Sequence, residues 1–424
     1  MSSPASSVLP IVPDPLCALL KASPAGVEPE RLEAGTASFQ RTARGMFVGG
    51  FATFAMLYGF QPLLPQFSHE FGLSPAQASG AMSAATGTLA LMLIPAGIAA
   101  DRFGRKGIMN AALGLAACLT LATALAADFS QLLILRALLG LVLAGLPAVA
   151  MAYLSEEVAP DSLGRSMGLY IAGNALGGMS GRLLASALTD WSSWRLAAAV
   201  LGGLGLLATV VFWRSLPPSR HFRPASISLA ALASGCRNHF SDVGLRWLFV
   251  VGFLLMGSFV SLYNYLGYRL VLPPFDLRPG QVGAVFSLYL IGMWGSAWAG
   301  KLADRLGRRN VLWVMVSVMA LGLGLTLAER LAVVLVGIGL FTFGFFAAHS
   351  VSSSWIGRRA TTGRALASAL YLSAYYLGSS SLGSFSGLMW GVGGWHGIAA
   401  LLALALAACI AIALRLRSLA PLTR

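Results

Sequence analysis

A ten-residue motif occurs twice in this chain, each time directly after a long apolar run. The first copy, GIAADRFGRK, spans Gly97–Lys106, and the second, GKLADRLGRR, spans Gly300–Arg309, 203 residues later. Six of the ten positions are identical, including both glycines, the Asp-Arg pair and the arginine that follows. The preceding runs, Met82–Ala100 and Val282–Ala299, contain no charged residue. Two copies at matching places in two halves of a chain indicate an internal duplication.

Composition limits the chain to a membrane protein. Of its 424 residues, 57% are hydrophobic and only 10% are charged, and the mean hydropathy is +0.76. Soluble domains carry about 25% charged residues, so this chain is too apolar to cover a soluble surface. In a soluble protein the net charge of +14 would suggest nucleic-acid binding. In a membrane protein basic loops account for it, and we expect a lipid bilayer and no nucleic acid as partner.

The apolar segments predict an all-α polytopic protein with twelve membrane-spanning helices in two pseudo-symmetric bundles. Each segment approaches the roughly 20 residues that cross a bilayer core. The predicted spans are 46–67, 77–100, 107–127, 131–153, 166–188, 195–214, 247–268, 279–300, 310–328, 331–352, 365–387 and 396–416. They divide the chain into a cytosolic tail (1–43), a six-helix bundle (44–214), a cytoplasmic linker (215–246), a second bundle (247–417) and a short tail (418–424). Within the linker, Ser226–Phe240 fits either an amphipathic surface helix or a plain connection.

The basic residues predict the orientation in the membrane. With twelve spans, 23 of the 29 Lys and Arg residues fall on the side that holds both termini, and four fall on the other side. Cytoplasmic loops carry the excess of Lys and Arg. We therefore expect a multi-pass protein of the bacterial inner membrane with both termini in the cytoplasm.

The duplicated motif in this topology resembles the major facilitator superfamily. Further stretches, among them LYGFQPLLP (Leu57–Pro65), GLYIAGNALGGMSGR (Gly168–Arg182) and FFAAHSVSSSWIG (Phe345–Gly357), resemble its YnfM-type bacterial inner-membrane permeases. Those are grouped with proton-driven exporters. The resemblance implies a secondary transporter that works by alternating access, with a small solute and protons as partners and no cofactor. One chain of twelve helices is sufficient for this mechanism, so we expect a functional monomer.

The resemblance also implies a gate built from the two motif loops. In the family, the motif acid faces the start of helix 11, here near Thr361–Arg364, and the basic residues pair with acids at the end of helix 4. The second copy would act against the start of helix 5. The predicted gating residues are Gly97, Asp101, Arg102, Gly104, Arg105, Glu156, Glu157, Gly300, Asp304, Arg305, Gly307 and Arg308. The alternative is that these loops only enforce topology.

A few polar residues fall inside the predicted spans and are candidates for coupling or for the substrate cavity. They are Tyr58, Gln61, Arg136, Asn174, Arg182, Asn264 and His349. Arg136 either faces the cavity or bonds the backbone carbonyls of a neighbouring helix, since an arginine at mid-membrane costs roughly 2.5–3.5 kcal/mol. Arg182 lies closer to a helix end and could snorkel. Asn174 stands where related antiporters have a proline, so the helix bend expected there is not assured.

None of the fifteen acidic residues lies in the middle of a predicted span. The interior candidates are positive or neutral, which favours an anionic or neutral polar solute over a lipophilic cation. We expect proton-coupled efflux, with uptake or uniport of a sugar or organic anion as the alternative. A membrane sensor that has lost transport is a third interpretation. No HExxH, GxSxG or GxxxxGK[ST] pattern occurs, so we expect no enzyme activity and no metal site.

Overall fold

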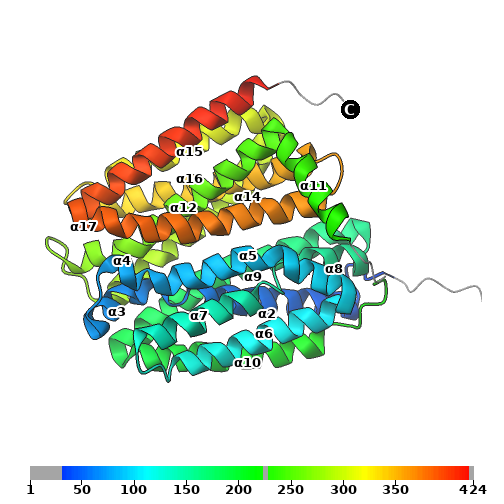
Figure 1. Ribbon diagram of the computed structural model, residues 1–424, viewed down its shortest axis with the longest axis horizontal. Coiled ribbons are helices and arrows are strands. Elements are labelled where there is room, and N and C mark those ends of the chain that lie inside the picture. The colour runs from blue at the N-terminus through cyan, green and yellow to red at the C-terminus, as the bar shows by residue number, and fades with distance from the viewer. Residues whose placement is uncertain (1–30, 223–227, 420–424) are drawn as a thin grey trace, which may run out of the picture.

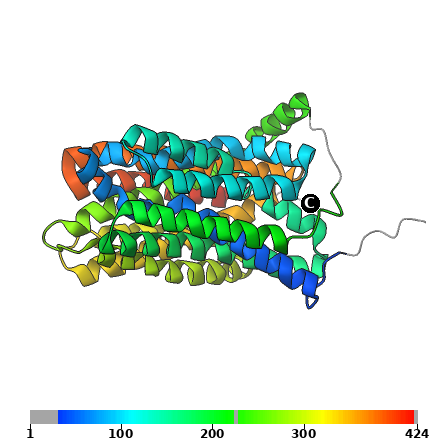
Figure 2. The same cartoon turned by 90° about the horizontal axis from the view of Figure 1, so that it is seen from below.

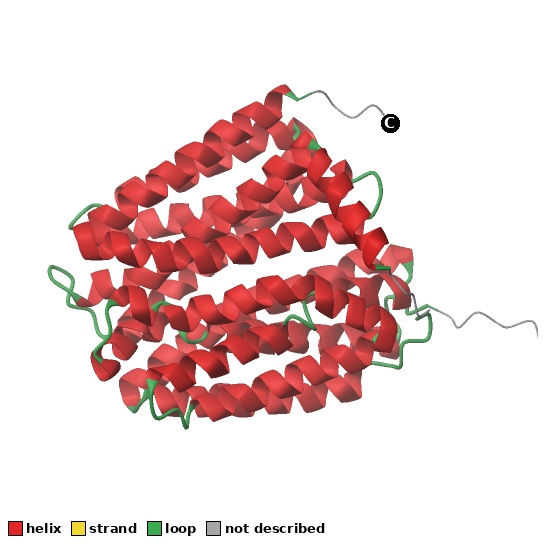
Figure 3. Cartoon of the chain, viewed as in Figure 1, coloured by secondary structure: helices red, strands yellow, loops and turns green. Residues whose placement is uncertain are grey.

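A computed structural model describes residues 31–222 and 228–419, and within these ranges the chain consists of helices and loops (Figure 3). The predicted cytosolic tails fall largely outside the described residues. In the first half the helices are α2 (Ala37–Tyr58), η1 (Gln61–Leu63), α3 (Leu64–Phe71), α4 (Pro75–Ala78), α5 (Gly80–Phe103), α6 (Arg105–Thr123), α7 (Phe129–Leu143), α8 (Ala150–Glu157), α9 (Pro160–Trp191) and α10 (Trp194–Ser215).

The second half begins after the linker helix α11 (Leu229–Ser241), which starts inside the segment predicted as amphipathic and ends one residue beyond it. Its helices are α12 (Val243–Val271), α13 (Pro279–Ala284), η2 (Val285–Leu288), α14 (Tyr289–Leu306), α15 (Arg308–Leu325), α16 (Leu331–Arg359) and α17 (Arg364–Ser418). Figure 2 shows α11 standing off to one side at one end of the molecule.

Nine continuous helical segments in the described residues are long and apolar enough to cross a membrane. The last of them, α17, holds two of the predicted spans, because the chain turns back at Gly393–Gly394, where the backbone is not helical. The segments α7–α8 and α9 supply the remaining two crossings; α9 is long enough but carries more polar residues. The fold is therefore that of an all-α polytopic membrane protein.

Several helix boundaries differ from the prediction, each for a local reason. The first helix begins at Ala37, inside the segment predicted as tail, because the Thr36 side chain caps it by accepting a hydrogen bond from the Phe39 amide. The fourth span is not one helix, since residues 144–149 separate α7 from α8. The first and eighth spans each contain a short 3-10 segment, η1 and η2.

The helices run side by side in two groups, one from each half (Figure 1). We call the end of the molecule that holds the turns at Gly104 and Gly307 the motif end, and the other end the opposite end. Both ends of the described chain and α11 lie at the motif end (Figures 1 and 2). This agrees with an even number of crossings.

Small residues let the helices of the first half approach closely. A Cβ atom added at Gly173 would collide with the carbonyl oxygen of Phe47, and one at Gly177 would collide with that of Phe51. These contacts hold α9 directly against α2, as glycine does in membrane helix pairs. The helix α9 continues without interruption through Asn174.

Candidate functional site

Each copy of the motif forms a tight turn between two membrane helices. Gly104 has φ +98° and Gly307 has φ +85°, values that favour glycine because a side chain would clash with the backbone. Each glycine ends one helix and begins the next: α5 and α6 in the first copy, α14 and α15 in the second. The duplication read from the sequence is thus matched by equal backbone geometry.

The first copy is tied to α8 by an ion-pair network. The Arg105 guanidinium contacts Asp101 at 3.1 Å and donates two hydrogen bonds, of 2.6 and 2.5 Å, to the carboxylate of Glu156. Arg102 lies over the Phe103 ring, at 5.4 Å from its centroid. Glu157 accepts hydrogen bonds from His221 of the linker instead of an arginine. Of the two arginines in this loop, only Arg105 forms a described ion pair with α8.

The second copy has a weaker set of contacts. Asp304 contacts Arg308 at 2.8 Å and Arg358 at 3.5 Å, and Arg308 also donates to the Ser354 hydroxyl. The side chain of Arg305 is exposed. A serine thus stands where the first copy has Glu156, and the two loops are not equivalent in strength.

The contacts that the family resemblance implies between the two halves are absent from this conformation. Asp101 pairs with Arg105 of its own loop, not with the start of α17, and Asp304 likewise stays with its own half. A Cβ atom added at Gly97 or Gly300 would have no described heavy atom within 4 Å. The gating role of the motif stays a prediction.

Arg136 is fully buried and bonds mainly to the backbone around it, with the Met82 Sδ atom 4.0 Å from its Nη2 atom. Its three guanidinium nitrogens donate to the carbonyl oxygens of Ala81, Met56 and Leu57, and it lies over the Phe60 ring. Of the two interpretations drawn from the sequence, this geometry is the one in which the residue joins neighbouring helices. In this conformation Arg136 does not face a cavity.

Arg182 lies at the junction of the two halves. Its side chain is buried and does not reach toward the helix end, so the expectation of snorkelling was wrong. It donates to the Oε1 atom of Gln61 at 2.7 Å and to the carbonyl of Gly178. Gln61 in turn donates to the Oδ1 atom of Asn264, again at 2.7 Å. This chain of side chains crosses from α9 through η1 to α12.

Aromatic rings surround that chain of polar groups. The Arg182 guanidinium lies 4.4 Å from the ring centroid of Tyr58, 4.9 Å from that of Tyr289 and 5.3 Å from that of Phe286. The structure therefore brings four of the predicted residues together: Tyr58, Gln61, Arg182 and Asn264. Tyr289 and Phe286 were not predicted, because an aromatic residue in an apolar run carries no distinguishing signal.

His349 and Asn174 lie apart from this group. The Nδ1 atom of His349 is 2.9 Å from the Tyr371 hydroxyl, and its ring packs at 4.6 Å from that of Tyr375. Asn174 lies beside Gly50 at the seam between α9 and α2, with its Oδ1 atom buried. Neither contacts Arg182 through a hydrogen bond in the described structure.

The hydrogen bonds between the two halves lie between Arg182 and the opposite end, so far as the described residues show. Besides the Gln61–Asn264 bond, Tyr268 bonds Ser68 and the Leu64 carbonyl. The side chain of Ser83 accepts a hydrogen bond from Ser384 at 2.7 Å, and its carbonyl accepts one from Ser380. These serines were missed in the sequence, where serine within a span is too common to single out.

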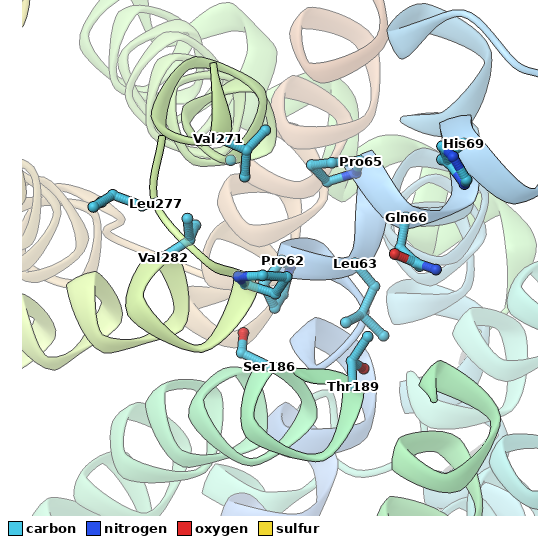
Figure 4. Close-up of a pocket in the computed structure, with 12 residues that line it drawn as sticks. Pro62, Leu63, Pro65, Gln66, His69, Ser186, Thr189, Val271, Leu277 and Val282 are labelled. Carbon is cyan, nitrogen blue, oxygen red and sulfur yellow. The ribbon is translucent and has the colours of Figure 1, made fainter. Parts of the chain in front are cut away.

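A cavity lies between the halves on the far side of Gln61 from the motif end. It has a volume of about 270 Å³ and is lined mostly by apolar side chains (Figure 4). Pro62 and Leu63 of η1, Ser186 and Thr189 of α9, and Val282 of α13 surround it (Figure 4). The cavity therefore lies on the opposite-end side of the Gln61–Asn264 hydrogen bond.

Comparison with known proteins places the chain in a family. The family model described as Major Facilitator Superfamily matches residues 46–278. The chain belongs to the major facilitator superfamily. It is 47% identical to the inner membrane transport protein YnfM of Escherichia coli over 91% of this chain and 92% of that protein. It is 43% identical to the MFS-type transporter YybF of Bacillus subtilis, over 86% and 90%.

Solved structures support the same fold. A bacterial homolog of the human lysosomal transporter Spinster, in an inward-facing and occupied conformation, superposes with a TM-score of 0.73. That match covers 91% of this chain and 96% of the other at 16% identity, so it bears on the fold alone. Family and fold together make the chain a membrane transporter and not an enzyme.

Proposed function

We propose that this transporter exports a small solute across the bacterial inner membrane by alternating access, in exchange for protons. Membership of the family accounts for transport of some small solute in a membrane. Export, proton exchange and action as a monomer are the proposal. The observation that supports alternating access is the distribution of contacts between the halves, which are concentrated toward the opposite end. Export and proton exchange are supported by the resemblance to proton-driven exporters.

The same distribution suggests which side is open. Glycines on the faces near the motif end, including Gly97, Gly164, Gly168 and Gly357, have no described heavy atom within 4 Å of an added Cβ atom. If the motif end is cytoplasmic, as the basic loops predict, this is the conformation that receives solute from the cytoplasm. Closing that end would bring the two motif loops toward the other half.

The two loops are suited to act as the gate for that closure. Arg105 holds Asp101 and Glu156 together, so the first loop and α8 would move as one unit. In the closed state, Asp101 would meet the start of α17 at Arg364, where free backbone N–H groups favour a carboxylate. Asp304 would meet the start of α9 in the same manner, without the support of a second carboxylate.

His349 is the proposed proton carrier. Histidine serves as a proton shuttle in many proteins because its imidazole binds and releases a proton reversibly. It is half-buried, and its hydrogen bond to Tyr371 joins α16 to α17, one of the helices that pack against the other half. A change in its charge would therefore act on a helix at the junction.

The test is proton movement in everted membrane vesicles that contain the full-length protein. The vesicles are energised with a respiratory substrate, and the pH gradient is followed as organic anions, pentoses and cationic dyes are added. Collapse of the gradient by a solute, absent in Asp101→Asn and His349→Ala vesicles, is the expected result. Transport of the same solute with no proton movement would reject exchange and favour uptake or uniport.

A further inference from the structure

Arg182 is a buried charge without a counter-charge. Its side chain is 2% exposed, and none of the ion pairs among the described residues includes it. The nearest acid along its own helix is Asp190, about 12 Å away by the rise of an α-helix. A guanidinium stays protonated in proteins. A charge inside a membrane is costly, and it either pairs with polar groups such as backbone carbonyls or marks a binding site.

Several groups near Arg182 are hydrogen-bond donors without a described partner. Arg182 uses Nε for Gln61 and Nη1 for Gly178, and Nη2 makes no hydrogen bond to a described residue. The hydroxyls of Tyr58 and Tyr289 and the Nδ2 atom of Asn264 are buried and likewise have no described partner. Buried polar atoms are nearly always satisfied. One cation and three unused donors, with no carboxylate among them, form a site of the right chemistry for an anion.

The rings restrict the shape of that anion. Tyr58, Tyr289 and Phe286 present their faces to the guanidinium within 5.3 Å. A flat group can stack between such rings while its carboxylate takes the two-pronged hydrogen bonds of an arginine. A compact inorganic anion would leave the aromatic surface unused.

Gln61 accepts the hydrogen bond of the Arg182 Nε atom in this conformation. Its carbonyl oxygen accepts the hydrogen bond from Arg182, while its amide nitrogen donates to Asn264 of the other half. The residue sits at the start of η1, where Pro62 interrupts the first membrane helix. One amide group therefore both satisfies an Arg182 donor and joins the halves.

We propose that a small, flat organic carboxylate binds Arg182 in place of Gln61, and that this exchange loosens the Gln61–Asn264 bridge so that the opposite end can open. This inference rests on the proposed transport and names its substrate class. Breaking the Arg182–Gln61 hydrogen bond would then both admit the solute and release the opposite end. An amide or an amine of the same shape would bind weakly, because neither carries the negative charge.

Purified full-length protein in lipid nanodiscs allows the test. Its melting temperature and its affinity by calorimetry are measured with benzoate, phenylacetate, sorbate and hexanoate, each beside its neutral amide, and with benzylamine. We expect at least one flat carboxylate to stabilise the protein while its amide and benzylamine do not. The result that overturns the inference is a panel in which no carboxylate binds better than its amide.

Variants separate binding from a structural role. Arg182→Gln should weaken carboxylate binding by about 10- to 100-fold, whereas the substitution Arg246→Gln, at an exposed arginine in the first turn of α12, should not change it. Arg182→Lys keeps the charge and should bind with intermediate affinity, which covers the case in which Arg182→Gln does not fold. Gln61→Leu should strengthen carboxylate binding, because the competing carbonyl is gone. Weaker binding in Gln61→Leu would contradict the exchange.

The outcomes also distinguish this inference from the proposed function. Carboxylate binding that depends on Arg182, without proton movement in vesicles, would leave the site intact and reject proton exchange. Proton-linked export of cationic dyes by a protein that binds no carboxylate would reject the site and leave export intact.

Discussion

At the scale of single residues, two buried arginines of the first half have opposite environments. Arg136 has all three nitrogens on backbone carbonyls of α2 and α5. Arg182 has one nitrogen without a described hydrogen-bond partner and shares another with an exchangeable glutamine. All the guanidinium nitrogens of Arg136 are used to join helices, whereas Arg182 has a nitrogen that can still bind a ligand. Their substitutions should therefore fail in different measurements.

Arg136→Met should lower stability without a specific effect on ligand selectivity. The change leaves the carbonyls of Met56 and Leu57, at the C-terminal end of α2, buried without donors, and an unsatisfied buried group costs about 1–3 kcal/mol. We expect a lower melting temperature in detergent than for wild type, and Arg136→Lys should recover little of it because an ammonium cannot reach all three carbonyls. The measurement is thermal unfolding of the purified proteins. An unchanged melting temperature in Arg136→Met would contradict this role.

At the scale of elements, the interruptions within the membrane segments have local causes. Pro62 follows η1's first residue, and glycines allow the turn between the last two spans. Gly394 has φ +54° and ψ −137°, a combination that is essentially restricted to glycine, whereas Gly393 has φ −145°, which any residue adopts. Neither glycine has a described heavy atom within 4 Å of an added Cβ atom. Substituting each glycine in turn therefore tests the effect of backbone strain without a change in packing.

Gly394→Ala should destabilise the protein, and Gly393→Ala should not. The strain of a side chain at the Gly394 backbone conformation is of order 1–3 kcal/mol. We expect a lower melting temperature and lower yield of folded protein for Gly394→Ala, with Gly393→Ala close to wild type. Thermal unfolding of both variants in the same detergent checks this. Equal melting temperatures for the two variants would show that the turn tolerates a side chain at either position.

At the scale of the whole molecule, the contacts between halves are uneven along the membrane normal. Hydrogen bonds of Gln61, Tyr268 and Ser83 to the other half lie toward the opposite end, and the motif glycines face open space. A transporter that alternates must break the first set when it forms contacts at the motif end. Locking the first set should then stop the cycle.

A disulfide between positions 83 and 384 should trap this conformation. The two serine hydroxyls are 2.7 Å apart, so Ser83→Cys/Ser384→Cys in a background without the native cysteines should cross-link on oxidation. We expect loss of at least nine-tenths of transport in vesicles, restored by a reducing agent, while each single variant stays active. Cross-linking is checked by loss of free thiols. A cross-linked protein that transports at the wild-type rate would show that these contacts do not open.

The sequence by itself determined the helical class, the duplication and the small set of polar residues inside the spans. These follow from hydropathy, loop charge and single-residue chemistry, which are local properties of a chain in a bilayer. It also placed Arg136 and Arg182 among the candidates but could not separate their environments. Which carbonyls and rings a buried guanidinium meets depends on residues from other helices.

Only the tertiary structure decided which candidates meet. It brought Gln61, Arg182 and Asn264, from η1, α9 and α12, into one chain of hydrogen bonds, and it left His349 and Asn174 elsewhere. It also placed the contacts between the halves toward one end, with the motif loops apart from the other half. The physical reason is that the two halves of a transporter pack against each other in more than one arrangement. Hydropathy and residue spacing are the same in every arrangement, so they cannot show which one is present.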